Sequence, residues 1–509
     1  MIFGSKKLKI LFITSEQAPF AKLGGLGEVI FSLPRALKRL GCDVRVMMPR
    51  YGTIDPNTNG LKLEHEHLLV PTGAEEEEKK QIICNVLRFD QTNDARSPVT
   101  TYFLENQEYF ELRSNVYGYA DDSIRFALLC RGTLEFLKIS KGWVPNIIVS
   151  ADWMGGFLPN FMKYDYKTDP IISKIASVFS IHNLAYQGTP ISHKFTPELD
   201  KDDGNGPIPS FFGDRIKNLN PLRRGVIYAD FINTVSKKYA EEITTEKYGE
   251  GMEKLFHERK NRLYGILNGL DYETNNPETD HALAQNFNIK SLAKRNENKL
   301  ALQQRFSLPQ NKDVFVIGIV SRLTKQKGFN LLNPVIEPFL QDSKAQLIIT
   351  GTGDTEIMTY FQELEKKFPD QVRAYLQFYD TPHLIFAGTD VVLIPSMYEP
   401  SGLIQMEAMR YGAIPVARRT GGLADTIEDY SPQIHKGTGF LFDNFESSAL
   451  LMTLTRSLTN WRHQEDWQNI QKSAMKKDFS WDKSAAEYIK MFKEVYKAKK
   501  KEISGNQKK

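Results

Sequence analysis

The sequence is poor in cysteine and has no long apolar run. Its 509 residues include three cysteines, Cys42, Cys84 and Cys130, at wide and irregular spacing. An odd number without a C-x-x-C pair disfavours a disulfide framework or a cysteine metal site and favours reduced thiols. No segment approaches the roughly 18 consecutive apolar residues of a membrane-spanning helix, and the early apolar run Ile10–Ile13 is too short for a signal peptide. We therefore expect a cytoplasmic protein without a membrane partner.

The sequence also lacks a strong net charge. Its 66 Lys and Arg residues and 62 Asp and Glu residues give a formal charge of +4 at pH 7. Residues 491–509 hold seven lysines and two glutamates, a net +5, so the remainder of the chain carries −1. Such a body has no basic face of the kind that nucleic-acid binding needs, and we expect no nucleic-acid partner. No obligatory protein partner is evident either.

The composition and the apolar patterns predict large α/β domains. Apolar residues make up 41% of the chain and charged residues 25%, as in core-forming proteins. Short β-branched runs alternate with longer helical patterns, which is typical of parallel sheets covered by helices on both faces. The predicted strands are Leu8–Thr14, Asp43–Met48, Ile147–Ser150, Ile175–Ile181, Phe231–Val235, Val314–Val320, Gln346–Thr350, Val391–Ile394 and Ile414–Ala417. Helices are predicted near Gly25–Leu40, Ser123–Ile139 and Gly402–Tyr411.

Each half is predicted to be a doubly wound, Rossmann-like unit, and the two units are expected to face each other across a cleft. The turn-forming stretch Asn268–Asp271 marks the expected boundary. We therefore expect domains over residues 1–266 and 267–480. Residues 481–509 are expected to form a helix and a Lys-rich tail that can pack back on the first domain, with the turns around Lys499–Lys501 frayed.

A glycine loop follows the first predicted strand. In Lys22-Leu23-Gly24-Gly25-Leu26, the consecutive glycines let backbone amides approach a ligand closely, and the helix that follows adds partial positive charge. Lys22 adds a full charge, so the loop suits an anion. The pattern matches neither of the two best-known phosphate-binding fingerprints, and a turn that serves tight packing alone is an equally good interpretation.

Two basic residues follow the strand predicted at Val314–Val320. Ligands of open α/β sheets bind beyond the carboxyl ends of strands, and Arg322 and Lys327 lie there. A guanidinium fork and an ammonium suit two phosphate groups. The alternative, surface cations that serve solubility, is favoured for this segment taken alone.

A second loop follows the strand Val391–Ile394. Glu399 lies in this loop, and Glu407 lies eight residues later, about two helical turns on. Glu399 is suited to hold sugar hydroxyls, and the amides of Ser401, Gly402 and Leu403 to cradle phosphate. For Glu407, a carboxylate that only stabilises a helix start is a reasonable alternative.

Several motifs together resemble those of the bacterial glycogen synthases and plant starch synthases. The resemblance extends from about Ile10 to Tyr488. The motifs are Lys22–Leu26, Ile181–Gly188, Tyr228–Asp230, Thr234–Ser236, Gly265–Asp271, Ser321–Leu323 with Lys327-Gly328, Tyr398–Leu403 and Arg418–Leu423. Their number and order make the resemblance specific.

The resemblance implies the GT-B fold and transfer of glucose from ADP-glucose to the non-reducing end of an α-1,4-glucan, with retention of configuration. It implies an acceptor-side first domain and a second domain that binds the nucleotide sugar. Glu399 would contact the donor glucose, Arg322 and Lys327 would neutralise the leaving diphosphate, and His182 would offer its main-chain carbonyl to C1. The implied donor-binding residues are Lys22, Gly24, Gly25, Asp152, Asn268, Ser401, Gly402, Leu403, Glu407 and Thr420.

The residues favour a route without metal or other cofactor. Fixed cations and backbone amides are enough to stabilise a departing diphosphate. The acidic run Asp200–Asp203 lacks the further ligand of a calcium loop and is better explained as a solvated loop. His65 and His67 lack a third ligand nearby and are better explained by an exposed strand face. Without a second carboxylate opposite Glu399, we expect front-side substitution, in which the leaving phosphate accepts the acceptor's proton.

Three departures from the family pattern leave the donor open. Glu28 stands where the family has an aspartate, Ser401 where it has a cysteine, and Val149–Ala151 where it has two histidines. UDP-glucose or a different acceptor is therefore the alternative, and a silent glucan-binding protein is a third interpretation. An aromatic ring at Phe378 or Tyr379 is expected to stack on the base, which does not discriminate between bases.

Overall fold

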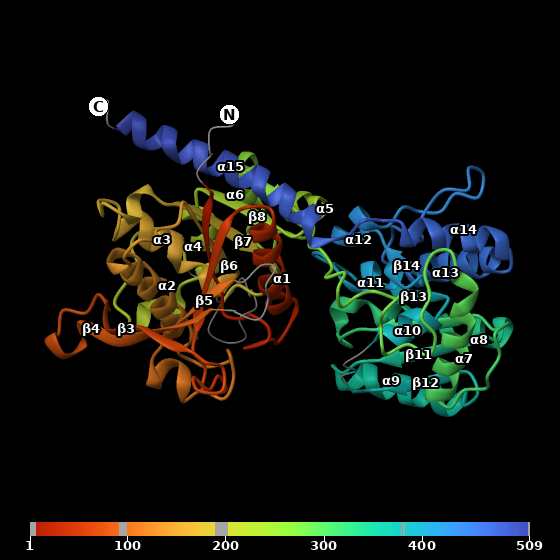
Figure 1. Ribbon diagram of the computed structural model, residues 1–509. Helices are drawn as coiled ribbons and strands as arrows, with labels where there is room; N and C mark the ends of the chain where they lie inside the picture. The colour runs from red at the N-terminus through yellow and green to blue at the C-terminus, as the bar shows by residue number, and fades with distance from the viewer. Residues whose placement is uncertain (1–6, 91–98, 189–201, 378, 380–381, 507–509) are drawn as a thin grey trace. The chain divides into compact units, whose positions relative to one another are not determined.

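The structure is a computed structural model, and it describes residues 7–90, 99–188, 202–377, 379 and 382–506. The chain divides into two compact units (Figure 1). The first unit contains the chain up to Val235, residues Ala240–Ile266 and the chain from Trp481 onward. The second unit contains Ser236–Tyr239 and Leu267–Ser480.

Within the described residues, the first unit is built on a nine-stranded sheet of order β3-β4-β5-β2-β1-β6-β7-β8-β9. Strands β1, β2 and β5–β9 run parallel to one another, whereas β4 is antiparallel to both of its neighbours, β3 and β5. The strands are β1 (Lys9–Ile13), β2 (Asp43–Pro49), β3 (Lys62–Pro71), β4 (Gln81–Asp90), β5 (Thr100–Glu105), β6 (Ile147–Ala151), β7 (Ala176–Ile181), β8 (Phe231–Thr234) and β9 (Leu263–Gly265).

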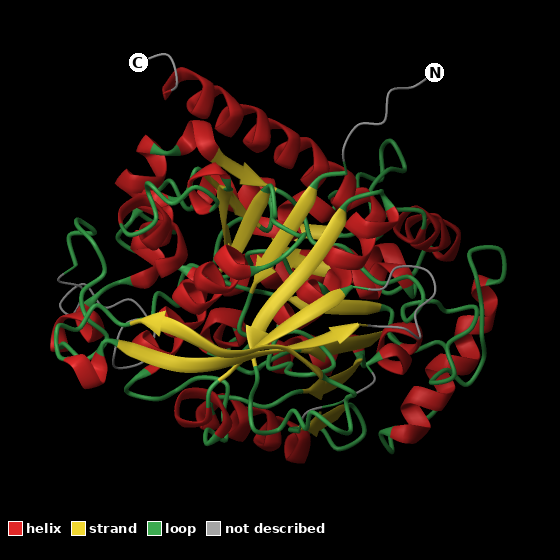
Figure 2. Ribbon diagram, turned by 60° about the vertical axis from the view of Figure 1, so that its left-hand side comes forward, coloured by secondary structure: helices red, strands yellow, loops and turns green. Residues whose placement is uncertain are grey.

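The central strands of this sheet are buried because both of their faces are covered. All residues of β6 and β7 are buried, as expected for parallel strands between two layers of helices. In Figure 2 the helices, in red, lie on both sides of the yellow strands. The helices of this unit are α1 (Gly25–Arg39), α2 (Asp122–Ile139), α3 (Phe157–Tyr164), α4 (Pro221–Tyr228), α6 (Glu253–Glu258) and α15 (Trp481–Asn506), and the short α5 (Lys237–Glu242) is divided between the units.

The second unit contains a six-stranded, fully parallel sheet of order β12-β11-β10-β13-β14-β15 among the described residues. Its strands are β10 (Val316–Val320), β11 (Gln346–Thr350), β12 (Val372–Tyr375), β13 (Val391–Ile394), β14 (Ile414–Arg418) and β15 (Phe440–Phe442). Its helices are α7 (Arg295–Arg305), α8 (Ile336–Ser343), α9 (Thr355–Lys367), α10 (His383–Gly388), α11 (Ile404–Arg410), α12 (Gly421–Thr426), α13 (Ser447–Trp461) and α14 (Gln464–Met475).

The α/β fold class is confirmed, and every strand predicted from the sequence is present within two residues of its expected ends. The third predicted helix starts two residues late, at Ile404, because Gly402 adopts a φ of +65° that no α-helix allows. Of the long antiparallel strands β3 and β4, labelled in Figure 1, the sequence indicated only the strand face at His65 and His67, which lies in β3, and β4 was not predicted.

The expectation that the last helix frays around Lys499–Lys501 is wrong. Helix α15 continues to Asn506, and Lys499 is 9% exposed. Its ammonium lies 4.0 Å from Asp230 and 3.3 Å from Glu502, so two carboxylates hold this turn in place. No helix in the described part of the chain has both the length and the hydropathy needed to span a membrane.

Candidate functional site

The carboxyl ends of β10 and β13, which are neighbours in the second sheet, border a cavity of about 60 Å³. Lys327 and Glu399, both predicted from the sequence, lie on its wall. The lining residues are Val320, Ser321, Lys327, Phe329, Leu393, Ile394, Pro395, Ser396, Glu399, Gly402, Leu403, Ile404 and Gln405. The second unit therefore gathers its candidate residues where parallel sheets bind ligands.

Lys327 and Glu399 form a largely buried ion pair in this cavity. The Lys327 ammonium lies 2.6 Å from Glu399 Oε2, and the Ser396 hydroxyl donates to the same oxygen at 2.9 Å. Gly328 allows this approach: its φ is +73°, and a Cβ atom there would lie 2.1 Å from the Pro395 carbonyl oxygen. The turn that carries Lys327 is thereby pressed against the tip of β13.

The loop between Glu399 and α11 is held by its carbonyl groups. Gln405 is fully buried, and its side-chain amide donates to the carbonyls of Ser401 at 3.1 Å and Gly402 at 2.9 Å. The N–H groups of Ser401, Gly402 and Leu403 have no acceptor among the residues that the structure describes. The loop thus offers backbone donors beside the Lys327 ammonium.

The loop at the start of α12 fixes the backbone of Glu399. Gly421 has a φ of +44°, and a Cβ atom there would lie 2.0 Å from the Glu399 carbonyl oxygen. The same oxygen accepts a hydrogen bond from Gly422 N at 3.0 Å. Thr420, the residue before this helix, is fully buried. A side chain at position 421 would therefore displace Glu399.

The remaining basic and acidic candidates of the second unit differ in accessibility. The Arg322 side chain is exposed and has no hydrogen bond or ion pair within the described ranges. Arg418, in contrast, is buried and donates to the carbonyls of Ser396 and Met397, so it braces the loop before Glu399. Glu407 lies in the first turn of α11, and it is not among the residues that line the cavity.

Asn268 adds a buried polar atom to the second unit. It is 7% exposed, and its Oδ1 has no hydrogen-bond partner among the described residues. A buried carbonyl oxygen without a donor is costly, which favours a ligand that supplies one. Tyr379, the described member of the base-stacking pair, contacts the rings of Phe306 and Tyr375. Phe378 lies outside the described residues.

The first unit places Asp152 and His182 at the tips of β6 and β7. Asp152 is 8% exposed, has a φ of 49°, and accepts hydrogen bonds on Oδ1 from His182 N at 2.7 Å and Asn183 N at 3.3 Å. Burial raises the pKa of the Asp152 carboxyl to about 7. Burial lowers the pKa of His182 to about 4, so the imidazole is neutral at pH 7.

The glycine loop uses its amides within the chain. The carboxylate of Glu16, which is 3% exposed, accepts hydrogen bonds from Leu23 N at 2.6 Å and Gly24 N at 3.1 Å. Gly24 thus donates to a carboxylate, while Gly25 is the first residue of α1. Lys22 is exposed and lies 3.0 Å from Glu28. The sequence pattern predicted an anion at this loop, with tight packing as an equal alternative, and it missed the internal carboxylate.

The acidic run proposed as a rival metal site contains a buried ion pair, so a fully solvated loop was the wrong expectation. Asp202 is 6% exposed, and both of its oxygens lie 2.8 Å from the guanidinium of Arg224. Asp203 is exposed, and residues 200 and 201 lie outside the described residues. Among the residues described, no group of three His, Cys, Asp or Glu side chains is placed to hold a metal.

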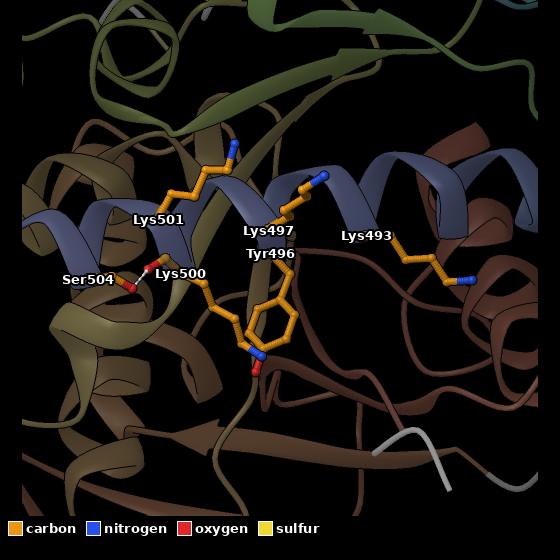
Figure 3. A pocket seen from close by; sticks show the side chains of 6 residues that line it. All are labelled: Lys493, Tyr496, Lys497, Lys500, Lys501 and Ser504. Atoms are coloured by element: carbon orange, nitrogen blue, oxygen red, sulfur yellow. Dashed lines mark hydrogen bonds between the residues drawn. The ribbon is translucent and has the colours of Figure 1, made fainter. Parts of the chain in front are cut away.

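A larger cavity, of about 480 Å³, runs along α15 (Figure 3). Tyr496 in its wall accepts a hydrogen bond from Asn146, which precedes β6. This cavity therefore lies at the amino edge of the first sheet, opposite the strand tips that carry Asp152 and His182. Its lining residues are Lys493, Tyr496, Lys497, Lys500, Lys501 and Ser504.

Comparison with known proteins finds similar proteins for both units. Residues 9–258 match the starch synthase catalytic domain, and residues 302–474 match the glycosyl transferases group 1. A glycogen synthase of Anoxybacillus flavithermus is 39% identical, with 96% of this chain and 98% of the relative covered. One from Thermotoga petrophila is also 39% identical, with 96% and 99% covered. The solved catalytic domain of starch synthase IV from Arabidopsis thaliana, bound to ADP and acarbose, is 29% identical with a TM-score of 0.81, and 96% of this chain and 100% of that chain are covered.

Proposed function

Because this chain belongs to the family of bacterial glycogen synthases and plant starch synthases, we propose that it transfers glucose from ADP-glucose to an α-1,4-glucan. Glucose is added at the non-reducing end, and the α-configuration is retained. The observation that carries this proposal is the Lys327–Glu399 pair beside the donor N–H groups of Ser401–Leu403. This cavity combines a carboxylate that can bind a sugar with a cation and N–H donors that can bind a diphosphate.

The second unit supplies the stabilisation of the leaving group. When the bond between C1 and the diphosphate oxygen breaks, negative charge develops on that oxygen. Lys327 and the exposed Arg322 neutralise it, and the loop amides donate hydrogen bonds to the phosphate oxygens. Because these donors are fixed by Gln405 and by the Gly328 turn, little reorganisation is needed as the charge develops.

Glu399 orients the donor glucose. A carboxylate offers about four lone-pair sites, so Glu399 can accept from sugar hydroxyls while it keeps Ser396 and Lys327 as partners. Asn268 Oδ1 is a further acceptor for a sugar hydroxyl. These contacts fix the ring so that C1 faces the acceptor hydroxyl, which is how positioning lowers a barrier.

The first unit supplies neutral and anionic groups for the sugar. His182 is neutral at pH 7, so its proposed contribution is the main-chain carbonyl that partly balances positive charge at C1. Asp152 holds the amides of His182 and Asn183, and Lys22 reaches the donor phosphates.

In front-side substitution, the acceptor oxygen bonds to C1 on the face that the phosphate leaves. The acceptor's proton passes to the departing phosphate oxygen.

The donor assignment is supported by the starch synthase structure that was solved with ADP. We expect radiolabel from ADP-glucose, incubated with the full chain and glycogen, to enter polymer at least tenfold faster than label from UDP-glucose. The product should be degraded by an α-1,4-specific glucanase. Faster transfer from UDP-glucose would replace the donor in this proposal, and no transfer from either would reject it.

The role of Glu399 is tested by substitution with alanine. Loss of the sugar contact and of the Lys327 partner is expected to lower kcat by about 10³-fold or more, since single electrostatic contacts of this kind are worth about 10²–10³. Glu428→Gln is the control, because Glu428 is an exposed carboxylate of the same unit, paired with Lys477. Wild-type turnover in Glu399→Ala would show that the donor does not bind in this cavity.

A further inference from the structure

Glu16 is a buried carboxylate that no sequence motif singled out. It lies just after β1, and its Oε2 accepts the N–H groups of Leu23 and Gly24. The residue next to this contact, Lys22, carries the charge that the proposed function assigns to the donor phosphates. The Glu16 carboxylate therefore fixes the backbone from which Lys22 projects.

The same contact occurs a second time in the first unit. Asp152, after β6, accepts the consecutive N–H groups of His182 and Asn183 as Glu16 accepts those of Leu23 and Gly24. Strands β1 and β6 are adjacent, with Ile13 opposite Ser150, so the two carboxylates follow neighbouring strand tips. Each of two loops with a proposed catalytic role is thus held by one buried carboxylate.

An ionised Glu16 costs desolvation free energy, and an ionised group is not needed to accept the two hydrogen bonds. A buried carboxylate is desolvated, and burial raises the pKa of Glu16 despite the two amide hydrogen bonds. A glutamine oxygen could accept the same two N–H groups without an ionised group. The negative charge of Glu16 also contributes to the raised pKa of Asp152. Glu16 is therefore placed to act on both loops.

We propose that Glu16 is a positioning residue of the transfer reaction. It holds the glycine loop in place for Lys22, and its negative charge acts on the neighbouring Asp152 carboxyl. This inference rests on the proposed function. The titratable group that acts on Asp152 by its charge is Glu16, from the segment after β1. His182, whose main-chain N–H donates to Asp152, stays neutral above pH 5. Removing the charge of Glu16 therefore leaves Asp152 without its anionic neighbour.

Two variants separate the hydrogen bonds of Glu16 from its charge. Glu16→Ala removes both, whereas Glu16→Gln keeps an oxygen acceptor and removes the charge. We expect Glu16→Ala to lower kcat/KM for the nucleotide sugar at least tenfold, and Glu16→Gln to restore most of that loss at pH 8. In Glu16→Gln, the acid limb of the pH profile of kcat/KM should move to lower pH by at least half a unit, because Asp152 then ionises more easily. Glu135→Gln is the matched control, a buried carboxylate of the same unit that contacts Tyr166 and Lys138.

Amide hydrogen exchange gives a readout that does not depend on activity. The amides of Leu23 and Gly24 should exchange at least tenfold faster in Glu16→Ala than in the wild type, and at the wild-type rate in Glu135→Gln. Faster exchange with unchanged kcat/KM and pH profile would reduce Glu16 to a structural residue and overturn the inference. Unchanged exchange would show that Glu16 does not hold the amides of Leu23 and Gly24. If the wild type transfers no glucose, the proposed function fails while the exchange result still decides whether Glu16 holds the loop.

Discussion

The two units differ in which backbone groups of the loops at their strand ends are hydrogen-bonded within the chain. In the first unit, the carboxylates of Glu16 and Asp152 occupy the N–H groups of the loops. In the second unit, the side chains of Gln405 and Arg418 donate to loop carbonyls, and loop N–H groups remain for a ligand. One unit thus satisfies its donors internally, while the other satisfies its acceptors.

This difference supports the proposal that the diphosphate binds to the second unit. A loop whose N–H groups already meet a carboxylate repels a further anion, whereas a loop whose carbonyls are occupied presents its positive side. Lys22, which is exposed and paired with Glu28, is then the main cationic contribution of the glycine loop. Substitutions in the second unit should therefore affect leaving-group departure more than those in the first.

The largest effect is expected for Lys327→Met. This substitution removes the charge that we propose faces the diphosphate. It also leaves the Glu399 carboxylate buried without its cation, and breaking a buried pair in this way costs about 3–5 kcal/mol. We expect kcat to fall by about 10³-fold or more and Tm to fall as well, measured by glucan synthesis and by calorimetry.

Lys325→Met controls for this result, because Lys325 lies on the same short helical turn with an exposed side chain. It should keep both kcat and Tm. Equal losses in the two variants would mean that the turn, and not the Lys327–Glu399 pair, carries the effect. A wild-type kcat in Lys327→Met would show that the diphosphate does not bind in this cavity.

A smaller effect, with a pH signature, is expected for Asp152→Asn. The folded-state pKa of Asp152 is about 7 against an ordinary value of 3.8, so the folded chain binds more protons than the unfolded chain between these values. The wild-type free energy of unfolding therefore decreases as the pH rises from about 4 to 7. Asparagine does not ionise, so the stability of the variant relative to the wild type should increase over the same window.

Activity should respond in the opposite direction in that variant. An ionised Asp152 is the better acceptor for the amides of His182 and Asn183, so wild-type kcat/KM is expected to rise through pH 7. Asp152→Asn should lose that rise and about 10²-fold of kcat/KM at pH 8. Denaturant titrations and rate profiles between pH 5 and 9 check both statements, and a rise retained in the variant would assign it to another group.

The fold was predictable because the parallel strands have a simple signal. Strands such as β7 and β11 are short, rich in apolar residues and fully buried, which the alternation of apolar runs and helical patterns reveals. Of the hairpin strand β3, only the strand face at His65 and His67 was predicted. Its full length was missed because most of its residues are exposed and its register shifts twice, so its apolar positions do not alternate. The stability of the α15 end was missed because it depends on Asp230, which is distant in sequence.

The site was predictable where a charged residue follows a strand tip in a family motif, as at Arg322, Lys327 and Glu399. Their roles stay predictions, but the structure brings Lys327 and Glu399 into contact. Glu16 and Gln405 were missed because they act on the backbone of residues three to eight positions away, which leaves no chemical pattern of its own. The available signal for Glu16 was a carboxylate immediately after a buried strand and before a glycine loop.

The smallest effect is expected at Glu28, in the first unit. The Lys22–Glu28 pair is solvent-accessible, with side-chain exposures of 56% and 30%, and such pairs contribute about 0–1 kcal/mol. Glu28→Asp shortens the carboxylate by one methylene and frees Lys22 for the donor, so KM for the nucleotide sugar should change by no more than about fivefold, with kcat and Tm unchanged. The comparison is made with ADP-glucose and UDP-glucose in parallel, with Glu108→Asp as an exposed control in the same unit. A change in KM for one donor but not the other would show that the glycine loop selects the base, and it would give the first unit a larger share of donor recognition than its charge arrangement indicates.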